Sequence, residues 1–473
     1  MNSEKTNLIS LMNNIAKDRD RWIKRNKYYY QDLKKFFRYH IPEGSSVLEI
    51  GCGTGEILAS VNPAIGVGID LSEAMVEIAK KKYPHLNFFQ MDAEQILLED
   101  KFEYVIISDT LGYFFDIQKV FSSLHNITDS STRIIITYHS FLWTPFLKLA
   151  EILKLKMPQR KLNWLNKDDI SGLLECEGFE IVTYGRRLLF PKYLPVLSTL
   201  LNKFLAHFPL INKLCLTGYI IARLKHDQNT QDKPNSISII IPARNEKGNI
   251  EVIINKLIGL KEPMEVIFVE GNSTDGTLEE IKKICDKYKD RIDLKYFVQD
   301  GKGKGNAVRC GFSKAKGDIL IILDADMTVP PEELPKFFNI IRKGIGEFVY
   351  GSRLVYPLEK DSMRTLNLLG NKFFSIVFSW LLGQSIKDTL CGTKVISKKN
   401  YEKLIKNRKY FGDFDPFGDF DLILGASKLN LKFIEIPIRY YSRQYGKTNI
   451  SRFQHGWLLL KMSFFALFKI KFY

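Results

Sequence analysis

The chain has 473 residues, too many for one ordinary hydrophobic core, so two or three domains are expected. Its hydrophobic content of 45% and charged content of 26% are typical of globular proteins and exclude a mostly disordered chain. The net charge of +16 divides into +5 over residues 1–226 and +11 over 227–473. Such a basic surface attracts nucleic acid, anionic lipid or phosphorylated substrates, although a Lys-rich proteome alone would also produce it.

The six cysteines form no CxxC pair, so they predict neither a disulfide framework nor a zinc site and suit a reducing compartment. The first 22 residues lack the basic start and apolar core of a signal peptide. No stretch of 18 or more apolar residues is free of charge, so the sequence predicts no transmembrane helix. We therefore expect a cytoplasmic protein.

Short apolar runs alternate with amphipathic stretches, a pattern typical of mostly parallel sheets covered by helices. An Arg/Tyr-rich helix is predicted at about 17–39. Strands are predicted at 46–50, 66–70, 87–91, 103–108 and 132–137, and then at 237–241, 265–269, 293–297, 318–323 and 347–350. The polar, proline-containing segment 227–235 predicts a linker. The fold class expected is therefore α/β, with two domains.

Three glycines, Gly51, Gly53 and Gly55, stand where the first strand turns into a helix and allow close backbone approach to a ligand. A tight turn without a ligand would also explain them. Asp70 ends the next strand, placed to accept hydrogen bonds from ribose hydroxyls, and Asp92 follows the third, near an adenine edge. The glycines and acids together predict a nucleoside-containing cofactor.

The acidic residues around the glycines favour S-adenosylmethionine over NAD. A dinucleotide fingerprint has a third glycine where this chain has Glu56, and a carboxylate there would repel a pyrophosphate. S-adenosylmethionine has no phosphate and carries a sulfonium and an ammonium, which an acidic rim attracts. That rim is predicted to consist of Glu49, Glu56, Asp70 and Asp92.

The first half resembles class I S-adenosylmethionine-dependent methyltransferases over about 47–223. The resemblance implies a Rossmann-like domain at 1–226 with cofactor contacts at Glu49, Gly51, Gly53, Asp70, Asp92 and Asp109. Such enzymes often place substrate groups after the fourth and fifth strands, where this chain has Asp109, Tyr113 and His139. A histidine at a strand end is often structural instead, so a base role for His139 stays open beside that alternative.

Polar loops follow three strands of the second half, at the edge where open α/β sheets bind nucleotides. The first two loops contribute Pro242, Arg244, Asn245 and Glu246, and then Glu270, Asn272, Ser273 and Asp275. After the third strand, Asp324 and Asp326 point to one side of an extended chain and Ala325 to the other. Two convergent carboxylates suit Mg²⁺ or Mn²⁺ with a diphosphate completing its ligands, whereas two solvated acids in a turn are the alternative. A glycine-rich loop with Lys302, Lys304 and Arg309 is either phosphate-facing or simply solvated.

These motifs, in this order, resemble family-2 glycosyltransferases of the GT-A fold, and most of all the dolichol- or polyprenyl-phosphate sugar synthases. The resemblance implies a domain at 236–455 that binds a nucleotide sugar through the loops above, including Lys304, Asp324, Ala325 and Asp326. It implies metal ligands at Asp324 and Asp326, catalytic roles for Asp326, Asp388 and Asp421, and an acceptor or phosphate site at Arg353, Arg443 and Lys447. Two departures are Glu270-Gly271 in place of an Asp pair and Asn449 in place of a lysine.

The expected activity is inverting transfer of a sugar from a nucleotide sugar to a polyprenyl phosphate, with a fused methyltransferase acting on a glycan or lipid. A lipid phosphate needs no base because it is already ionised, whereas a hydroxyl acceptor would need Asp388 or Asp421. The alternative is a polysaccharide hydroxyl acceptor, with the N-terminal half as a non-catalytic binding module. No nucleic-acid recognition motif is present, so no nucleic-acid partner is expected.

Four segments are unusually apolar: 141–157, 188–221, 366–382 and 457–473. Residues 436–473 contain seven Lys/Arg and no acid. These features predict a basic amphipathic helix at 456–473 that lies on an anionic membrane surface, unless it packs on the protein's own sheet or on a second subunit. We therefore expect peripheral association with the inner face of the membrane.

Overall fold

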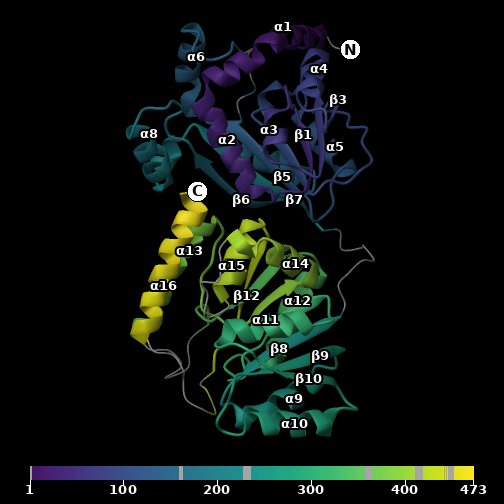
Figure 1. Ribbon diagram of the computed structural model, residues 1–473, viewed down its shortest axis with the longest axis vertical. Helices are drawn as coiled ribbons and strands as arrows, with labels where there is room; N and C mark the ends of the chain where they lie inside the picture. The colour runs from purple at the N-terminus through teal and green to yellow at the C-terminus, as the bar shows by residue number, and fades with distance from the viewer. Residues whose placement is uncertain are drawn as a thin grey trace. The chain divides into compact units, whose positions relative to one another are not determined.

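The computed structural model describes residues 3–158, 163, 165–226, 236–356, 365–410, 419–441, 443, 445 and 452–472. The chain divides into two compact units, each with its own sheet and core (Figure 1). Unit 1 is Met1–Lys225 with Lys471–Tyr473, and unit 2 is His226–Ile470. The predicted linker 227–235 lies outside the described residues, and the domain boundaries given above stay a prediction.

Unit 1 is built on a mixed sheet whose seven described strands run in the order β3-β2-β1-β4-β5-β7-β6. The strands β1 to β5 pair in parallel, and β7 runs antiparallel to both of its neighbours. β1 is apolar and buried at almost every position, as expected of a parallel strand covered on both faces. The strands are β1 Ser46–Ile50, β2 Ile65–Asp70, β3 Asn87–Gln90, β4 Tyr104–Ser108, β5 Arg133–His139, β6 Phe179–Arg187 and β7 Thr217–Leu224.

Helices cover both faces of this sheet, and each face has its own hydrophobic core. The single helix predicted at about 17–39 is wrong, because α1 and α2 meet at Asn26. Asn26 has a φ of −107° and a ψ of 33°, outside the α-helical region, and this local change of backbone conformation separates the two helices. The helices are α1 Ser3–Arg25, α2 Lys27–His40, α3 Glu56–Ser60, α4 Glu73–Lys82, α5 Ile117–Ser123, α6 Thr144–Ile152, α7 Lys167–Cys176 and α8 Leu197–Thr199.

Unit 2 also has a mixed sheet, with seven described strands in the order β10-β9-β8-β11-β13-β12-β14. β10, β9, β8 and β11 are parallel, and β13 runs antiparallel to β11 and β12. The strands are β8 Ile237–Ala243, β9 Met264–Glu270, β10 Asp293–Val298, β11 Ile319–Ile322, β12 Phe348–Ser352, β13 Lys394–Ser397 and β14 Phe433–Pro437. The α/β fold class is confirmed, and each of the ten predicted strands begins and ends within about two residues of its prediction.

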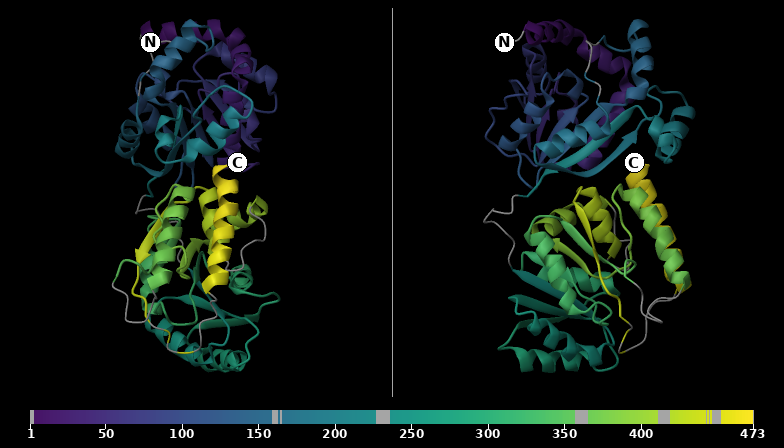
Figure 2. Two further views of the ribbon diagram at one scale, coloured as in Figure 1. Left: turned by 90° about the vertical axis from the view of Figure 1, so that its left-hand side faces the viewer. Right: turned by 180° about the vertical axis from the view of Figure 1, so that it is seen from behind.

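Helices flank the second sheet in the same way. They are α9 Ile250–Gly259, α10 Thr277–Tyr288, α11 Lys304–Lys314, α12 Leu334–Arg342, α13 Thr365–Leu382, α14 Lys398–Lys406, α15 Asp419–Lys428 and α16 Arg452–Ala466. The last helix begins at Arg452 rather than at 456, and it lies alongside α13 (Figure 2). Within the described ranges, no helix is long and apolar enough to cross a membrane.

Candidate active sites of the two units

Unit 1 contains a cavity of about 380 Å³ beside the carboxyl ends of β1, β2 and β4. Neighbouring parallel strands end at one edge of the sheet, so residues far apart in the sequence meet there. All six predicted cofactor residues line this cavity: Glu49, Gly51, Gly53, Asp70, Asp92 and Asp109. The structure therefore brings the predicted set together, while its role in cofactor binding stays a prediction.

The loop after β1 is fixed by Asp70 at the end of β2. One Asp70 carboxylate oxygen accepts a hydrogen bond from the Gly53 N–H at 2.8 Å, and the other accepts from the Ser72 N–H at 2.9 Å. Burial raises the pKa of Asp70. Gly51 has a φ of +73°, and a Cβ there would lie 2.3 Å from the Thr110 side chain. Glycine is required at this position because of both the backbone conformation and the close contact.

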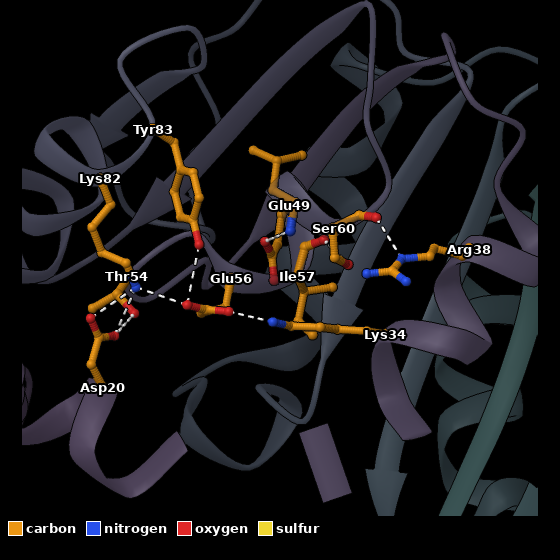
Figure 3. Close-up of polar contacts among 11 residues, drawn as sticks. Asp20, Lys34, Arg38, Glu49, Thr54, Glu56, Ile57, Ser60, Lys82 and Tyr83 are labelled. Carbon is orange, nitrogen blue, oxygen red and sulfur yellow. Dashed lines mark hydrogen bonds and ion pairs between the residues drawn. The ribbon is translucent and has the colours of Figure 1, made fainter. Parts of the chain in front are cut away.

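The four acids predicted to surround the cofactor differ in their partners. Glu49 is buried and accepts a hydrogen bond from the Leu58 N–H at 2.9 Å, and burial raises its pKa to about 8. Glu56 instead lies between Lys34 and Lys82 (Figure 3), with 2.9 Å to the Lys82 ammonium. Burial alone would raise the pKa of Glu56, but the hydrogen bonds from the two lysines outweigh it and lower the pKa to about 2.

Asp92 is likewise paired, with Lys5 of α1, which also lies 3.0 Å from Glu94. Lysines thus neutralise two of the four acids in the predicted rim. Because its charge is neutralised, Glu56 would repel a pyrophosphate less strongly than an unpaired carboxylate would. The cationic character expected of the ligand therefore depends mainly on Asp70, because Glu49, with a pKa of about 8, is largely protonated at neutral pH.

The first two helices supply cavity residues that the sequence did not identify. Lys5, Arg19, Tyr29 and Tyr30 all line the cavity, and the Arg19 guanidinium lies 5.8 Å from the centre of the Tyr30 ring. The Arg/Tyr-rich composition of this region was the available signal. No motif spacing connects it to the strands, so only tertiary packing places it against the cavity.

Tyr29 completes a polar cluster with Asp109 and His139. The Tyr29 hydroxyl donates to Asp109 and lies 3.1 Å from His139 Nε2, and the Thr137 hydroxyl donates to Asp109 at 2.9 Å. Burial lowers the pKa of His139, so the imidazole is neutral at neutral pH and can accept a proton. Tyr113, also predicted for the acceptor site, lines the same cavity.

In unit 2, the loops after β8 and β9 are hydrogen-bonded to each other. The Asn245 N–H donates to the Ser273 hydroxyl at 3.0 Å, and the Asn245 side-chain oxygen accepts from the Thr274 N–H at 2.9 Å. Buried Glu270 accepts from the N–H groups of Asn272 and Ser273. These bonds hold most of the predicted nucleotide loop in one arrangement.

The remaining residues of these loops lie close by. The Asp275 carboxylate accepts from the Thr277 N–H at 3.0 Å and so fixes the start of α10. Pro242 lies in β8 opposite Val269. Arg244 of the first loop lies close to Gly271 of the second, because a Cβ added at Gly271 would be 3.2 Å from the Arg244 Cβ. The two loops therefore pack against each other.

Asp324 and Asp326 follow β11, and each is paired with a cation from a distant segment. The Lys304 ammonium lies 2.6 Å from Asp324. Burial alone would raise the pKa of Asp324, but the attraction of Lys304 outweighs it, so the pKa is lowered. Ala325 is buried, as its alternating position predicts. A Cβ at Gly392 would lie 1.8 Å from the Asp324 carboxylate, so this motif residue leaves room for the acid.

Arg443 bridges the first and third loops of the site. Its two terminal nitrogens lie 2.8 Å from Glu246 and 2.8 Å from Asp326, and Thr328 donates to Asp326 at 2.7 Å. Within the described ranges, no three His, Cys, Asp or Glu residues form a metal-ligand group. The metal site predicted at Asp324 and Asp326 stays a prediction, and in the structure both carboxylates are paired with cationic side chains.

Both candidate general bases are paired with arginines. Asp388 is buried and lies 2.6 and 2.8 Å from two nitrogens of Arg353. Burial would raise its pKa, but Arg353 outweighs that effect and lowers it. Asp421 lies 3.4 Å from Arg309 and 3.2 Å from Arg408. These contacts fit positioning roles better than proton abstraction.

Two of the predicted acceptor residues thus have defined partners, Arg353 at Asp388 and Arg443 at Asp326. Lys447, the third, lies outside the described residues. Gln299, which the sequence did not single out, follows β10 beside Gly271, and its buried side-chain oxygen has no hydrogen-bond partner among the described residues. A glutamine after an edge strand carries no motif, so sequence alone offered no signal for it.

Comparison with known protein families agrees with this division of the chain. Residues 21–184 match the family described as methyltransferase domain, and residues 238–405 match glycosyl transferase family 2. Each unit thus contains a region that matches a transferase family, the first a methyltransferase domain and the second glycosyl transferase family 2.

Individual relatives match about half of the chain. A low-salt glycan biosynthesis hexosyltransferase of Haloferax volcanii is 30% identical over 229 residues, covering 47% of this chain and 51% of the relative. A dolichol-phosphate mannosyltransferase of Pyrococcus furiosus is 27% identical over 237 residues, covering 48% of this chain and 64% of the relative. The chain thus spans between half and two thirds of the length of these relatives.

Among solved structures, a methyltransferase of Thermotoga maritima, a possible histamine N-methyltransferase, covers 46% of this chain and 99% of its own. It is 18% identical, with a TM-score of 0.36. A likeness this remote has no bearing on the activity.

Proposed function

We propose that unit 2 transfers a sugar from a nucleotide donor to a polyprenyl phosphate with the help of Mg²⁺ or Mn²⁺, and that unit 1 methylates a glycan or lipid. The observation that carries the first activity is the junction of the first and third strand-end loops at Arg443, which contacts both Glu246 and Asp326. It concentrates acidic and basic groups where a metal-bound diphosphate would lie. The similarity to a dolichol-phosphate mannosyltransferase supports the same acceptor class.

The donor site is supported by the groups around these loops. A divalent cation at Asp324 and Asp326 would stabilise negative charge on the departing nucleoside diphosphate. Lys304 and Arg443 would then bind phosphate oxygens, which guanidinium and ammonium groups hold well. The unpartnered oxygen of Gln299 suits an N–H donor of a nucleotide base.

A phosphate acceptor is favoured over a hydroxyl by the state of the two candidate bases. Asp388 and Asp421 are both held by arginines, so neither is placed to remove a proton. A phosphate acceptor requires no such step, because its oxygen is already anionic at neutral pH. Arg443, with Lys447 near it in the sequence, would hold that acceptor electrostatically.

A lipid acceptor is supported by the surface of α16. Leu459, Met462 and Ala466 are buried, while the opposite side exposes large apolar side chains. These exposed residues are Trp457, Leu460, Phe464 and Phe468. The absence of acids from 436 to 473 fits contact with anionic lipid, and so does the basic character of that stretch. We propose that α16 packs on α13 through one side and lies on the cytoplasmic membrane face through the other.

In unit 1, the cavity supports cofactor binding and methyl transfer. S-adenosylmethionine supplies an electrophilic methyl group when bound. Asp70 and Glu49 both line the cavity; Asp70 would accept hydrogen bonds from a ribose, and a cationic group of the cofactor would favour the ionised form of Glu49. The neutral His139, oriented by Tyr29 and Asp109, can take the proton that the acceptor loses.

Mass spectrometry of reaction products tests both activities. The full chain is incubated with a panel of nucleotide sugars and with either polyprenyl phosphate or a polysaccharide fragment bearing free hydroxyls. We expect a sugar adduct on the lipid phosphate only. Transfer to the hydroxyl acceptor with none to the lipid phosphate would establish the alternative function. Cofactor binding without methyl turnover would make unit 1 a binding module.

A further inference from the structure

Unit 1 exposes large apolar side chains along two segments, 141–155 and 193–214. None of the side chains of α6 is buried, and its outward residues include Phe146, 62% exposed, and Ile152, 77% exposed. Monomeric proteins rarely expose contiguous apolar surface on this scale without a binding role. We call these residues the apolar face: Phe141, Leu142, Phe146, Leu149, Ile152, Leu153, Tyr193, Leu194, Val196, Leu197, Leu200, Phe208, Leu210 and Leu214.

The two segments meet at the start of α6, where they are hydrogen-bonded to each other. The Trp143 indole N–H donates to the carbonyl of Leu214 at 2.8 Å, and the Ser140 N–H donates to the carbonyl of Leu216 at 2.7 Å. The Trp143 and Phe146 rings lie 5.5 Å apart between centroids. The apolar face is therefore continuous across the start of α6.

The apolar face is also the outer side of the cavity wall. Leu147 and Ala150 of α6 line the cavity, whereas Phe146 and Leu149 of the same helix are exposed. The second segment is flanked by Lys192 and other cavity-lining residues. One short wall thus separates the reaction site from the exposed apolar side chains, so a molecule anchored outside could reach inside with a short headgroup.

The charge around the apolar face is one-sided. Residues 181–226 contain seven Lys/Arg and no Asp or Glu, and of these seven Arg187 and Arg223 are paired with Asp32 and Glu180. Exposed lysines accompany both segments, namely Lys148, Lys154, Lys203 and Lys213. Glu151, the acid on α6, is paired with Lys156 at 2.8 Å. Apolar side chains with surrounding lysines are complementary to the interface of an anionic bilayer, where acyl chains meet negative headgroups.

We propose that the apolar face is a bilayer-contacting surface of unit 1, and that the methyl acceptor is borne on a lipid that reaches the cavity from that bilayer. The second clause rests on the methyl transfer proposed above. In that reaction the acceptor's oxygen or nitrogen bonds to the methyl carbon as the sulfur–carbon bond breaks. The electron pair stays on sulfur, giving S-adenosylhomocysteine, and the acceptor's proton passes to His139.

Hydrogen exchange on the full chain tests the contact. Vesicles of phosphatidylcholine and phosphatidylglycerol in equal amounts should protect amides in 141–155 and 193–214, and vesicles of phosphatidylcholine alone should protect them less. Protection of these segments before vesicles are added, or none afterwards, would overturn the proposal. The first result would mean that another part of the chain or a second copy covers the face.

Vesicle binding by matched variants tests the same surface. Both variants carry Trp457→Ser and Phe464→Ser, which remove the exposed anchors of α16. Phe146→Ser with Leu149→Ser and Ile152→Ser should weaken vesicle binding about tenfold or more, because three large apolar side chains no longer leave water. The control replaces Ile65 and Leu97 with serine; both are exposed on unit 1 outside the two segments. Equal binding by the two variants would overturn the contact.

The acceptor class is tested with labelled S-adenosylmethionine and the lipid and aqueous extracts of source-cell membranes. Label should enter the chloroform-soluble fraction and decrease in the α6 variant, while calorimetry shows unchanged cofactor affinity. Label in the aqueous fraction alone, or in neither with cofactor bound, would reject a lipid acceptor. Loss of cofactor binding by the unaltered chain would reject the proposed methyl transfer instead, and the vesicle result would stand independently.

Discussion

The two sites hold their acidic residues in different ways. In unit 1, Asp70 and Glu49 accept hydrogen bonds from backbone N–H groups of nearby turns and helices. In unit 2, Asp324 and Asp326 are paired with the side chains of Lys304 and Arg443. Backbone donors fix each carboxyl group without pairing it to a lysine or arginine, so a cationic ligand can favour its ionised form. Cationic side chains neutralise the carboxylates until a ligand binds to the carboxylate, to the cationic side chain or to both.

This difference matches the charge of the two proposed ligands. A sulfonium cofactor needs acids that stay in place, whereas a metal-bound diphosphate brings both signs of charge. When the ligand binds, Lys304 and Arg443 can leave Asp324 and Asp326 and bind phosphate oxygens. The two carboxylates can then bind a cation in their place. The comparison therefore predicts a ligand-dependent rearrangement of side chains in unit 2 and a nearly prearranged site in unit 1.

The largest effect is expected for Asp326→Asn. Loss of this charge removes both a proposed metal ligand and the partner of Arg443, so sugar transfer should fall by about a hundredfold or more, as when a preorganised charge partner is lost. Product formation from a labelled nucleotide sugar measures it. The exposed Asp290→Asn variant is the control and should retain full transfer.

Chelation and Arg443→Gln sharpen this prediction. Excess chelator should abolish transfer by the unaltered chain, and undiminished transfer would remove the cation from the mechanism. If Arg443 competes with the cation for Asp326, Arg443→Gln should lower the metal concentration needed for half of maximal activity. The same variant should also lower the maximal rate, because a phosphate ligand is lost.

A smaller effect is expected for Asp70→Ala in unit 1. The variant loses the proposed hydrogen bonds to the ribose, which for a charged group contribute about 1.5–3 kcal/mol. S-Adenosylmethionine should therefore bind about ten to a hundred times more weakly by calorimetry. Glu73→Ala, an exposed acid on α4, should bind normally. Unchanged affinity in the Asp70 variant would mean that the glycine turn is structural only.

The last prediction concerns the stability of unit 1 rather than ligand binding, namely its pH dependence at Glu49. Its folded pKa of about 8 lies above the ordinary value of 4.5, so its stabilising contribution is complete below pH 4.5 and is lost as the pH rises through about 8. Each unit of pKa difference corresponds to about 1.4 kcal/mol. The unaltered chain should therefore lose stability between about pH 5 and about pH 9, and the Glu49→Gln variant should not. Denaturant midpoints measured across this pH range test the difference. The exposed Glu77→Gln variant should show the same pH dependence of stability as the unaltered chain. If Glu49→Gln showed that pH dependence too, burial would not set the pKa of Glu49.

Local pattern was sufficient where an element carries its own periodicity. The apolar runs of β1 and β11, and the polar residues just after them, located the strands and the loops. It was insufficient for β6, β7, β13 and β14, which pair with strands distant in sequence and have no motif of their own. The break at Asn26 was also missed, because it depends on the backbone conformation of a single residue inside an otherwise helical stretch.

The sequence by itself determined the two α/β halves, the glycine turn after β1 and the acidic pair after β11, since strand alternation and loop chemistry are local properties. Only the tertiary structure decided which charges meet. Tyr29 reaches Asp109 and His139 from a preceding helix, and Arg443 reaches Asp326 from more than a hundred residues away. Such contacts depend on how packed helices and strand ends converge, and no spacing in a linear chain encodes that convergence.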